Sequence, residues 1–312
     1  MVIRYDGIGD TVNLAPLLAA LRDAGHTLGL VVSPPAVGLF RSDVVRSHVV
    51  EDLEQPHSVL PDLLAREYDI ALIATEKAYG YTLAERAGIR RRIGFWNGFG
   101  KPLKSWWVRK ICTDVRWRGL SIGGEHEATM LFRLGRQLHP EAQPTRDLER
   151  LRHLFFRVAP ARQRVLAVQV TQKWLSFGDI DTLARMLREL FQRVPSMRCL
   201  GAASEERFLV ALEKRCEVAI ERHHTAQTWV ERLGSAAILL TPDTGAAHVA
   251  GMIGTKVIDC FPADTPTRLQ NRWRPWASPS ILYTMDILHK IGITAAVQSA
   301  CERLDEPFTL FS

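Results

Sequence analysis

Short runs of apolar, often β-branched residues alternate along this chain with longer stretches in which apolar residues recur every three or four positions. The first half predicts strands near Val2–Tyr5, Thr27–Val32, Val49–Asp52, Ile70–Ala74 and Arg92–Phe95. Between and after them, helical periodicity covers Thr11–Ala24, Val59–Arg66, Tyr81–Ala87 and Glu125–Leu138. Such alternation favours an α/β fold with a parallel sheet and helices on both of its faces.

A second alternation begins after His139–Gln163, a stretch rich in Pro and charge that is predicted to be a linker with a helix at Leu148–Phe156. Strands are predicted near Val165–Val170, Met197–Leu200, Glu217–Ile220, Ala237–Thr241, Lys256–Cys260 and Ile281–Tyr283. Helices are predicted near Ile180–Arg193, Ser204–Arg215 and Gln227–Leu233, and a last one near Ile287–Leu304. The chain is therefore expected to hold two doubly wound Rossmann-like domains, residues 1–155 and 156–285, and a C-terminal helix in 286–312.

The composition adds a compartment and a charge preference. With 312 residues, 46% of them hydrophobic, the chain can build two cores. It has no run of eighteen apolar residues and no basic N-terminal segment followed by an apolar one, so a cytosolic protein is expected. Five scattered Cys without a Cys-x-x-Cys pair are expected to be reduced and mostly buried, and a net charge of +6 suggests an anionic partner.

The segment from Thr241 to Phe261 carries the strongest chemical signal. A buried strand is predicted to end in the turn Asp243-Thr244-Gly245, and a helix that includes His248 follows at once. Free N–H groups and the dipole at such a helix start bind anions, and Asp243 suits an N-cap. A well-capped helix of an ordinary α/β protein is the other interpretation. His248 could donate to a phosphate or serve only packing.

A second turn, Gly7-Ile8-Gly9-Asp10, joins the first predicted strand to the first helix. Ligands bind outside the carboxyl ends of parallel strands, so Asp10 is expected on the ligand side of the sheet, although an N-cap role would also explain it. The turn is half of a dinucleotide fingerprint. Val12 stands where the third glycine would be, and no acid ends the second strand, so a hydride-transfer enzyme is disfavoured.

Both segments resemble one family. Asp243-Thr-Gly-x-x-His248-x-Ala250 with its following strand and Phe261-Pro262, and the opening Val2–Leu21, resemble the family 9 glycosyltransferases, the ADP-heptose:lipopolysaccharide heptosyltransferases. The resemblance implies GT-B architecture: two Rossmann-like domains facing across a cleft, the first binding the acceptor and the second the nucleotide sugar, with the C-terminal helix packing back on the first. It also implies inverting, metal-independent transfer with Asp10 as general base, and a nucleoside diphosphate sugar, ADP-heptose, as donor rather than any cofactor.

Two further positions follow from this resemblance. Thr171-Gln-Lys-Trp174 is similar to the family's lysine–tryptophan loop, which assigns Thr171 and Lys173 to the donor diphosphate. An exposed loop lysine without a role is the alternative. Glu205, four residues after Gly201, matches the family's ribose-binding glutamate, although acids also favour a first helical turn because of the dipole. The donor site is thus predicted to comprise Thr171, Lys173, Glu205, Asp243, Thr244, Gly245 and His248.

The charge excess is concentrated in Arg90–Arg118, which holds nine Lys or Arg, one acid and four Trp in what is expected to be a loop-rich segment. Interleaved Trp and cations suit an anionic glycolipid or glycan, and leave open peripheral contact at the inner face of the inner membrane. Stacking on single-stranded nucleic acid would fit the composition too, but the resemblance implies the lipopolysaccharide core as acceptor and no nucleic acid. A solvated basic face with Trp in the core is the remaining interpretation.

Other functions are disfavoured by particular residues. His223 and His224 lack partners at metal-ligand spacing, so no metal site is expected. A sugar-nucleotide 2-epimerase of the same fold needs no acceptor groove, and the basic Trp-rich segment argues against it. A non-catalytic nucleotide-sugar or glycolipid binding protein would have no need of Asp10.

Overall fold

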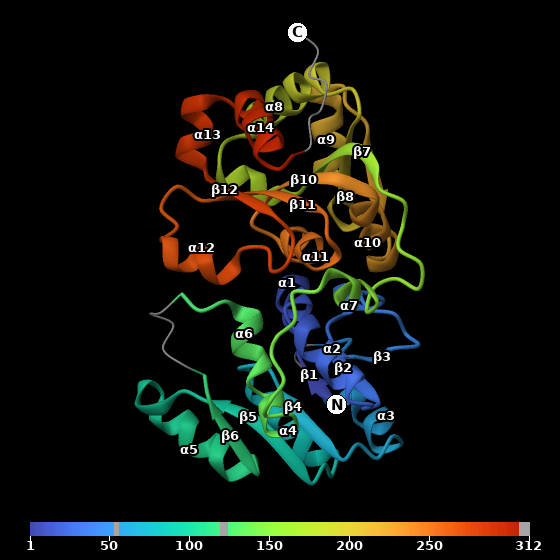
Figure 1. Ribbon diagram of the computed structural model, residues 1–312, viewed down its shortest axis with the longest axis vertical. Coiled ribbons are helices and arrows are strands. Elements are labelled where there is room, and N and C mark those ends of the chain that lie inside the picture. The colour runs from blue at the N-terminus through green and yellow to red at the C-terminus, as the bar shows by residue number, and fades with distance from the viewer. Residues whose placement is uncertain (53–55, 119–123, 306–312) are drawn as a thin grey trace. The chain divides into compact units, whose positions relative to one another are not determined.

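The computed structural model describes residues 1–52, 56–118 and 124–305 of the 312-residue chain. It divides into two compact units, Met1–Phe156 and Arg157–Ser312 (Figure 1). Each unit is built on its own six-stranded parallel sheet with helices between the strands. The predicted α/β class with two doubly wound domains is confirmed.

The sheet of the first unit has the strand order β3-β2-β1-β4-β5-β6. Its strands are β1 Val2–Ile3, β2 Leu28–Val32, β3 Val45–Val49, β4 Ile70–Ile73, β5 Arg91–Trp96 and β6 Asp114–Trp117. Its α-helices are α1 Ile8–Val12, α2 Ala15–Asp23, α3 Leu60–Leu64, α4 Ala78–Arg86, α5 Pro102–Ile111, α6 Glu127–Phe132 and α7 Leu148–Arg152. Helix α2 packs on α6 and α7, and α4 packs on α5. The order reverses between β1 and β4, which is the switch point of a doubly wound sheet.

The second unit repeats this arrangement with the order β12-β11-β10-β7-β8-β9. Its strands are β7 Gln163–Val170, β8 Met197–Ala202, β9 Ile220–His223, β10 Ala236–Pro242, β11 Lys256–Phe261 and β12 Ser280–Thr284. Its α-helices are α8 Ile180–Arg193, α9 Glu206–Cys216, α10 Ala226–Ser235, α11 Gly245–Ile253, α12 Thr267–Trp273, α13 Met285–Ile291 and α14 Ile293–Arg303. Here the switch point lies between β7 and β10.

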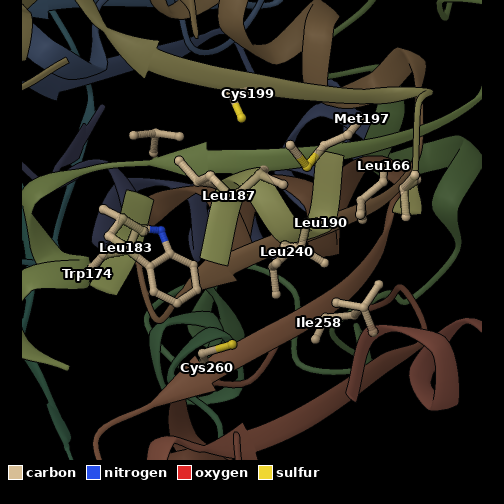
Figure 2. Close-up of a cluster of buried hydrophobic side chains, with 14 of the residues drawn as sticks. Leu166, Trp174, Leu183, Leu187, Leu190, Met197, Cys199, Leu240, Ile258 and Cys260 are labelled. Carbon is tan, nitrogen blue, oxygen red and sulfur yellow. The ribbon is translucent and has the colours of Figure 1, made fainter. Parts of the chain in front are cut away.

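The core of the second unit explains why α8 forms where the periodicity predicts it. Leu183, Leu187 and Leu190 recur at helical spacing and are buried against Leu166 of β7 and Leu240 of β10 (Figure 2). Burying a leucine side chain contributes roughly 1.5–3 kcal/mol. Asp179 caps this helix by accepting a hydrogen bond from the amide of Thr182 at 2.7 Å. Apolar burial and one cap thus fix the start and the orientation of α8.

The C-terminal helical segment belongs to the second unit. Positive φ at Gly292 (79°) separates α13 from α14, so the single helix predicted near Ile287–Leu304 is two helices. Ala296, Val297 and Ala300 of α14 are buried in the same core as α8. The apolar face of α14 is thus covered within its own unit, and the expected contact of the C-terminal helix with the first domain stays a prediction.

Other element boundaries also differ from the sequence-based prediction. Strand β3 is Val45–Val49 rather than Val49–Asp52, because Val45 pairs with Leu28 of β2. Strand β9 begins at Ile220, because Glu217 adopts a left-handed φ of 57° that ends α9. The segment Arg90–Arg118 is not loop-rich but contains β5, α5 and β6.

Candidate functional site

The loops that follow β7 and β10 meet at the switch point of the second unit, because these two strands are neighbours in the sheet. The loop after β7 carries Thr171 and Lys173, and the turn after β10 carries Asp243. Lys173 Nζ donates to the main-chain oxygen of Asp243 and lies 3.5 Å from Oδ2 of the same residue. The structure therefore brings together two predicted donor-site residues that are 70 positions apart in the chain.

Helix α11 begins directly after this turn. Its N-cap is Thr244, whose hydroxyl accepts from the amide of Ala246 at 3.3 Å and lies 2.9 Å from the hydroxyl of Thr241. The expectation that Asp243 is the N-cap is wrong, because the Asp243 carboxylate is directed to Lys173 instead. Gly245 is the first helical residue. The arrangement places a cation beside the positive end of a helix, as an anion site requires.

Two glycines determine how closely α11 packs and where it ends. A Cβ on Gly251 would come within 2.8 Å of the main-chain nitrogen of Trp276, so only glycine allows the helix to pack this closely on the segment before β12. Gly254 ends the helix with a φ of 89°, the left-handed C-cap conformation. These contacts hold the start of α11 at a fixed place on the sheet.

Glu205 connects the loops after β7 and β8. Its Oε1 accepts from the hydroxyl of Thr171 at 3.2 Å and from the amide of Gln172 at 3.1 Å. Glu206, the adjacent acid, instead pairs with Arg222 at 3.0 Å. Of the two neighbouring acids, it is therefore the predicted Glu205 that reaches the loop of Thr171 and Lys173.

His248 lies in the second turn of α11 and is buried. Its ring makes an edge contact with Trp273 of α12, with the ring centroids 5.8 Å apart. This contact supports the packing interpretation of His248.

A fully buried carboxyl lies beneath this site. Asp259 is in register with Thr241 on the neighbouring strand β11, and its oxygens have no hydrogen-bond partner among the described residues. Burial, and then the nearby charge of Asp243, raise the pKa of Asp259 well above its usual range. Burial also raises the pKa of Asp243, which Lys173 opposes.

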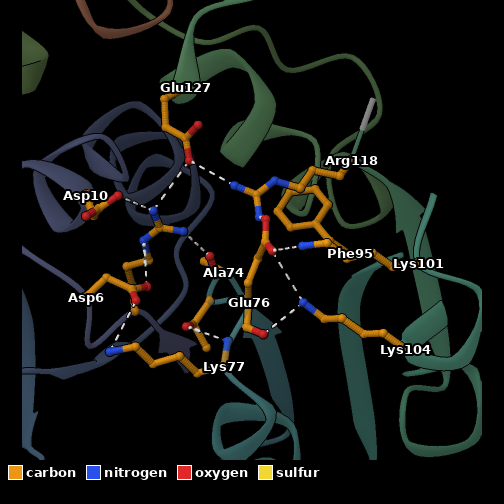
Figure 3. Close-up of polar contacts among 12 residues, drawn as sticks. Asp6, Asp10, Ala74, Glu76, Lys77, Phe95, Lys101, Lys104, Arg118 and Glu127 are labelled. Atoms are coloured by element: carbon orange, nitrogen blue, oxygen red, sulfur yellow. Dashed lines mark hydrogen bonds and ion pairs between the residues drawn. The ribbon is translucent and has the colours of Figure 1, made fainter. Parts of the chain in front are cut away.

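In the first unit, Asp10 lies at the carboxyl end of β1, which is the corresponding switch point. Arg4 Nη2 donates to Oδ1 of Asp10 at 2.5 Å and lies 3.4 Å from Oε1 of Glu127, while its Nε lies 3.3 Å from Asp6 (Figure 3). Arg4 also donates to the main-chain oxygen of Ala74 at the end of β4. A buried guanidinium thus holds the carboxylate of Asp10, which is itself about one-third exposed.

The ion pairs around Arg4 form a network that continues from Glu127 to Arg118, which directly follows the edge strand β6. Arg118 lies 3.6 Å from Glu127 and also contacts Glu76, and Glu76 lies within 3.5 Å of both Lys101 and Lys104 (Figure 3). Sequence reasoning singled out neither Arg4, nor Glu127, nor Glu76. The available signal was Arg4 itself, a charged residue that stands between the apolar residues of β1 and Tyr5.

The structure divides the cations of Arg90–Arg118 into several groups. Lys101, Lys104 and Arg118 gather around Glu76, as described above. Arg92 donates to the main-chain oxygens of Ile89 and Ile111, at 2.6 and 2.7 Å, and so has a structural role. Arg109 and Lys110 lie over the rings of Trp96 and Trp106.

In the described part of the chain, no group of three or more His, Cys, Asp and Glu side chains is arranged to hold a metal ion. Asp179 and Asp181 form an Asp-x-Asp pair, but Asp179 caps α8 and Asp181 pairs with Arg215 at 3.0 Å.

Within residues 1–52, 56–118 and 124–305, no helix is both long and apolar enough to cross a bilayer. A cavity of about 240 Å³ lies between α8, α13 and α14, and neither Asp243 nor Glu205 lines it.

No family model and no curated protein matches this chain in sequence. Solved structures do match its fold. A glycosyl transferase family 9 protein from Veillonella parvula is 13% identical, with 97% of this chain and 95% of that chain covered and a TM-score of 0.70. E. coli heptosyltransferase WaaC with ADP-2-deoxy-2-fluoro heptose is 15% identical, with 97% and 98% covered and a TM-score of 0.71. E. coli ADP-heptose lps heptosyltransferase II is 13% identical, with 96% and 99% covered and a TM-score of 0.65. The chain thus has the fold of these transferases over almost its full length.

Proposed function

We propose that this protein is an inverting, metal-independent glycosyltransferase of family 9 that transfers heptose from ADP-heptose to a hydroxyl of a lipopolysaccharide-core acceptor. The observation that carries the proposal is the gathering of Thr171, Lys173, Glu205 and the start of α11 at one switch point. Three chain segments, the loops after β7 and β8 and the start of α11, meet there and carry the groups that a nucleoside diphosphate needs. Its fold is that of structures described as heptosyltransferases, one of them with an ADP-heptose analogue.

The donor would bind through complementary charge and hydrogen bonding. Lys173 and the first amides of α11 suit the diphosphate, whose negative charge grows as the glycosidic bond to the sugar breaks. Glu205 suits the ribose hydroxyls, since a carboxylate accepts two hydrogen bonds from a diol. The proposal needs no metal, because the lysine and the helix dipole supply the positive charge.

Asp10 would act as the general base on the acceptor. It would take the proton of the acceptor hydroxyl as that oxygen forms a bond to the anomeric carbon and the nucleoside diphosphate leaves from the opposite side, which inverts the configuration. Arg4 holds the Asp10 carboxylate in a single orientation. About one-third of this carboxylate remains exposed and can meet a substrate.

The acceptor would bind to the cations gathered around Glu76. Lys101, Lys104 and Arg118 belong to the same ion-pair network as Asp10, so an anionic glycan held there would lie in the unit that carries the base. Such a glycan would compete with Glu76 for these cations. Cytosolic activity at the inner face of the inner membrane, where a lipid-linked acceptor would be found, is part of the proposal.

The test combines nucleotide binding with turnover. ADP should raise the melting temperature more than UDP or GDP, because a selective ligand stabilises by mass action. With ADP-heptose and a lipopolysaccharide-core acceptor, the wild type should release ADP. Asp10→Asn should lower turnover by roughly a hundred- to ten-thousand-fold with ADP binding unchanged. Wild-type turnover in the Asn variant would remove Asp10 from the mechanism.

The same assays separate the alternative functions. A 2-epimerase would alter a nucleotide sugar without any acceptor, and a binding protein would bind donor or acceptor without releasing ADP. Release of ADP that depends on the acceptor is the outcome that supports transfer.

A further inference from the structure

Helix α5 presents two large apolar side chains to solvent. Leu103 is 84% exposed and Trp106 is 60% exposed. They lie three residues apart on the helix, and Lys110, four residues further, places its ammonium 3.7 Å from the Trp106 ring centroid. Residues at this spacing share one face of a helix. We call Leu103, Trp106 and Lys110 the outer face of α5.

The opposite side of α5 is firmly packed. Ser105, Val108 and Ile111 are buried, and Trp107 makes an edge contact with Tyr81 at 5.6 Å between ring centroids. The exposure of Leu103 and Trp106 is therefore a property of an ordered helix. Folding of this unit leaves the two side chains in water, where a large exposed apolar surface is unfavourable.

The charge around the outer face is positive. Helix α5 contains no acidic residue and carries Lys104, Arg109 and Lys110, with Lys101 directly before it. Lys104 lies 3.5 Å from Glu76, on the side of the ion-pair network. Arg109 lies 4.5 Å from the Trp96 ring centroid, and Lys110 covers Trp106. Lys104, one of the cations gathered around Glu76, and the exposed apolar side chains thus belong to the same short helix.

Exposed Leu and Trp with adjacent cations match the chemistry of an anionic bilayer surface. Leu and the indole ring enter the boundary between headgroups and acyl chains, while lysine extends its ammonium to the phosphates. Each cation near such a surface adds attraction that salt screens. Because α5 carries basic and no acidic side chains, its charge is complementary to that of anionic lipid.

We propose that the outer face of α5 docks the first unit on a bilayer of anionic phospholipid. The proposal deepens the function proposed above and rests on it in one respect: a lipid-linked acceptor would reach Lys104 and Arg118 from the membrane to which α5 is bound. Bilayer binding itself needs neither donor nor acceptor, so it can be measured separately from transfer.

The test is co-sedimentation of the full chain with vesicles. Vesicles of phosphatidylethanolamine and phosphatidylglycerol should bind the wild type at low salt, and binding should weaken as salt is added. Vesicles of phosphatidylcholine alone should bind much less. The double variant Leu103→Asp/Trp106→Asp should lose about tenfold or more of the binding to anionic vesicles. Lys110→Glu should lower binding at low salt in particular.

The matched control is Val158→Asp, which changes a side chain that is 83% exposed in the second unit. Its vesicle binding should equal that of the wild type. Unchanged circular dichroism and unchanged ADP binding by the double variant would show that both units remain folded. Quenching of fluorescence by brominated lipid should fall in Trp106→Phe, because that indole is the one expected to enter the bilayer.

Several results would overturn the proposal. Equal vesicle binding by the double variant and the wild type would show that α5 is not the membrane-binding surface. If the wild type bound phosphatidylcholine vesicles as well as anionic vesicles, anionic lipid would not be the ligand. Binding of single-stranded oligonucleotide that the double variant loses, without vesicle binding, would assign the face to nucleic acid. Failure of ADP to bind the wild type would instead count against the donor site and leave vesicle binding as measured.

Discussion

Arg4 and Asp10 are joined by a hydrogen bond of 2.5 Å between Nη2 and Oδ1, and the guanidinium is almost completely buried. The same Nη2 lies 3.4 Å from Glu127, whose carboxylate is fully buried. One cation therefore compensates several acids at the carboxyl end of β1. This makes Arg4 a positioning residue for the proposed base.

We expect Arg4→Lys to keep part of the transfer activity and Arg4→Met to lower kcat by about a hundred-fold or more, with little change in the KM of the donor. Lysine retains the positive charge but lacks the planar guanidinium, whose several N–H groups reach Asp6, Asp10 and Glu127 together. Steady-state kinetics measure the difference. Arg4→Met leaves the buried Glu127 with only the cation of Arg118 at 3.6 Å, which can destabilise the fold. The double variant Arg4→Met/Glu127→Gln removes this buried charge as well and is the variant to compare with wild type. A kcat near wild type in that double variant would contradict a positioning role.

Lys173→Ala should weaken binding of ADP and of inorganic pyrophosphate alike, by about tenfold or more, since each loses a charge-assisted contact. Titration calorimetry with both ligands measures this. Lys214→Ala is the matched control, because Lys214 is an exposed lysine on α9 in the same unit. If Lys173→Ala and Lys214→Ala gave the same titration curves, the loop after β7 would not be a phosphate site.

Glu205→Gln should weaken the binding of ADP and leave the binding of pyrophosphate unchanged, because the carboxylate is assigned to the ribose, which pyrophosphate lacks. Gln can still accept from Thr171 and Gln172, so the loop contacts at 3.2 and 3.1 Å can persist. Glu206→Gln is the control, as Glu206 pairs with Arg222. ADP affinity that falls in the Glu206 variant and not in the Glu205 variant would reverse this assignment.

Asp259 predicts a dependence of stability on pH. Its pKa is raised in the folded protein, so above the ordinary value of 3.8 the folded state keeps a proton that the unfolded state releases. Over that range the free energy of unfolding should therefore fall as pH rises, by about 1.4 kcal/mol per pH unit from this group, until the raised pKa is passed.

Asp259→Asn removes this titration, so the variant should gain stability relative to wild type on going from about pH 5 to about pH 8. Urea unfolding at the two pH values measures the gain. Asp264→Asn, on the exposed turn after β11, should change nothing. A constant difference between Asp259→Asn and wild type at both pH values would mean that this carboxyl does not titrate in the range.

The sequence by itself determined the two doubly wound units, because hydrophobic periodicity is a local property and each strand or helix records it. It also placed Asp10, Thr171, Lys173, Glu205 and Asp243 at strand ends, since motif and strand are adjacent in the chain. What these side chains contact could not be read in the same way. The choice of Thr244 over Asp243 as N-cap, for example, depends on where Lys173 extends.

Only the tertiary structure decided the charged environment of Asp10. Arg4 and Glu127 are 123 residues apart, and they meet because α6, which carries Glu127, packs on α2 in the segment that follows β1. The same holds for α14, whose periodicity predicts an apolar face but not that this face packs on α8. In helix α5, the sequence shows the cations and tryptophans. Only the packing of the helix against Tyr81 and the sheet decides that Leu103 and Trp106 face solvent. Contacts between distant segments depend on topology, which local periodicity does not encode.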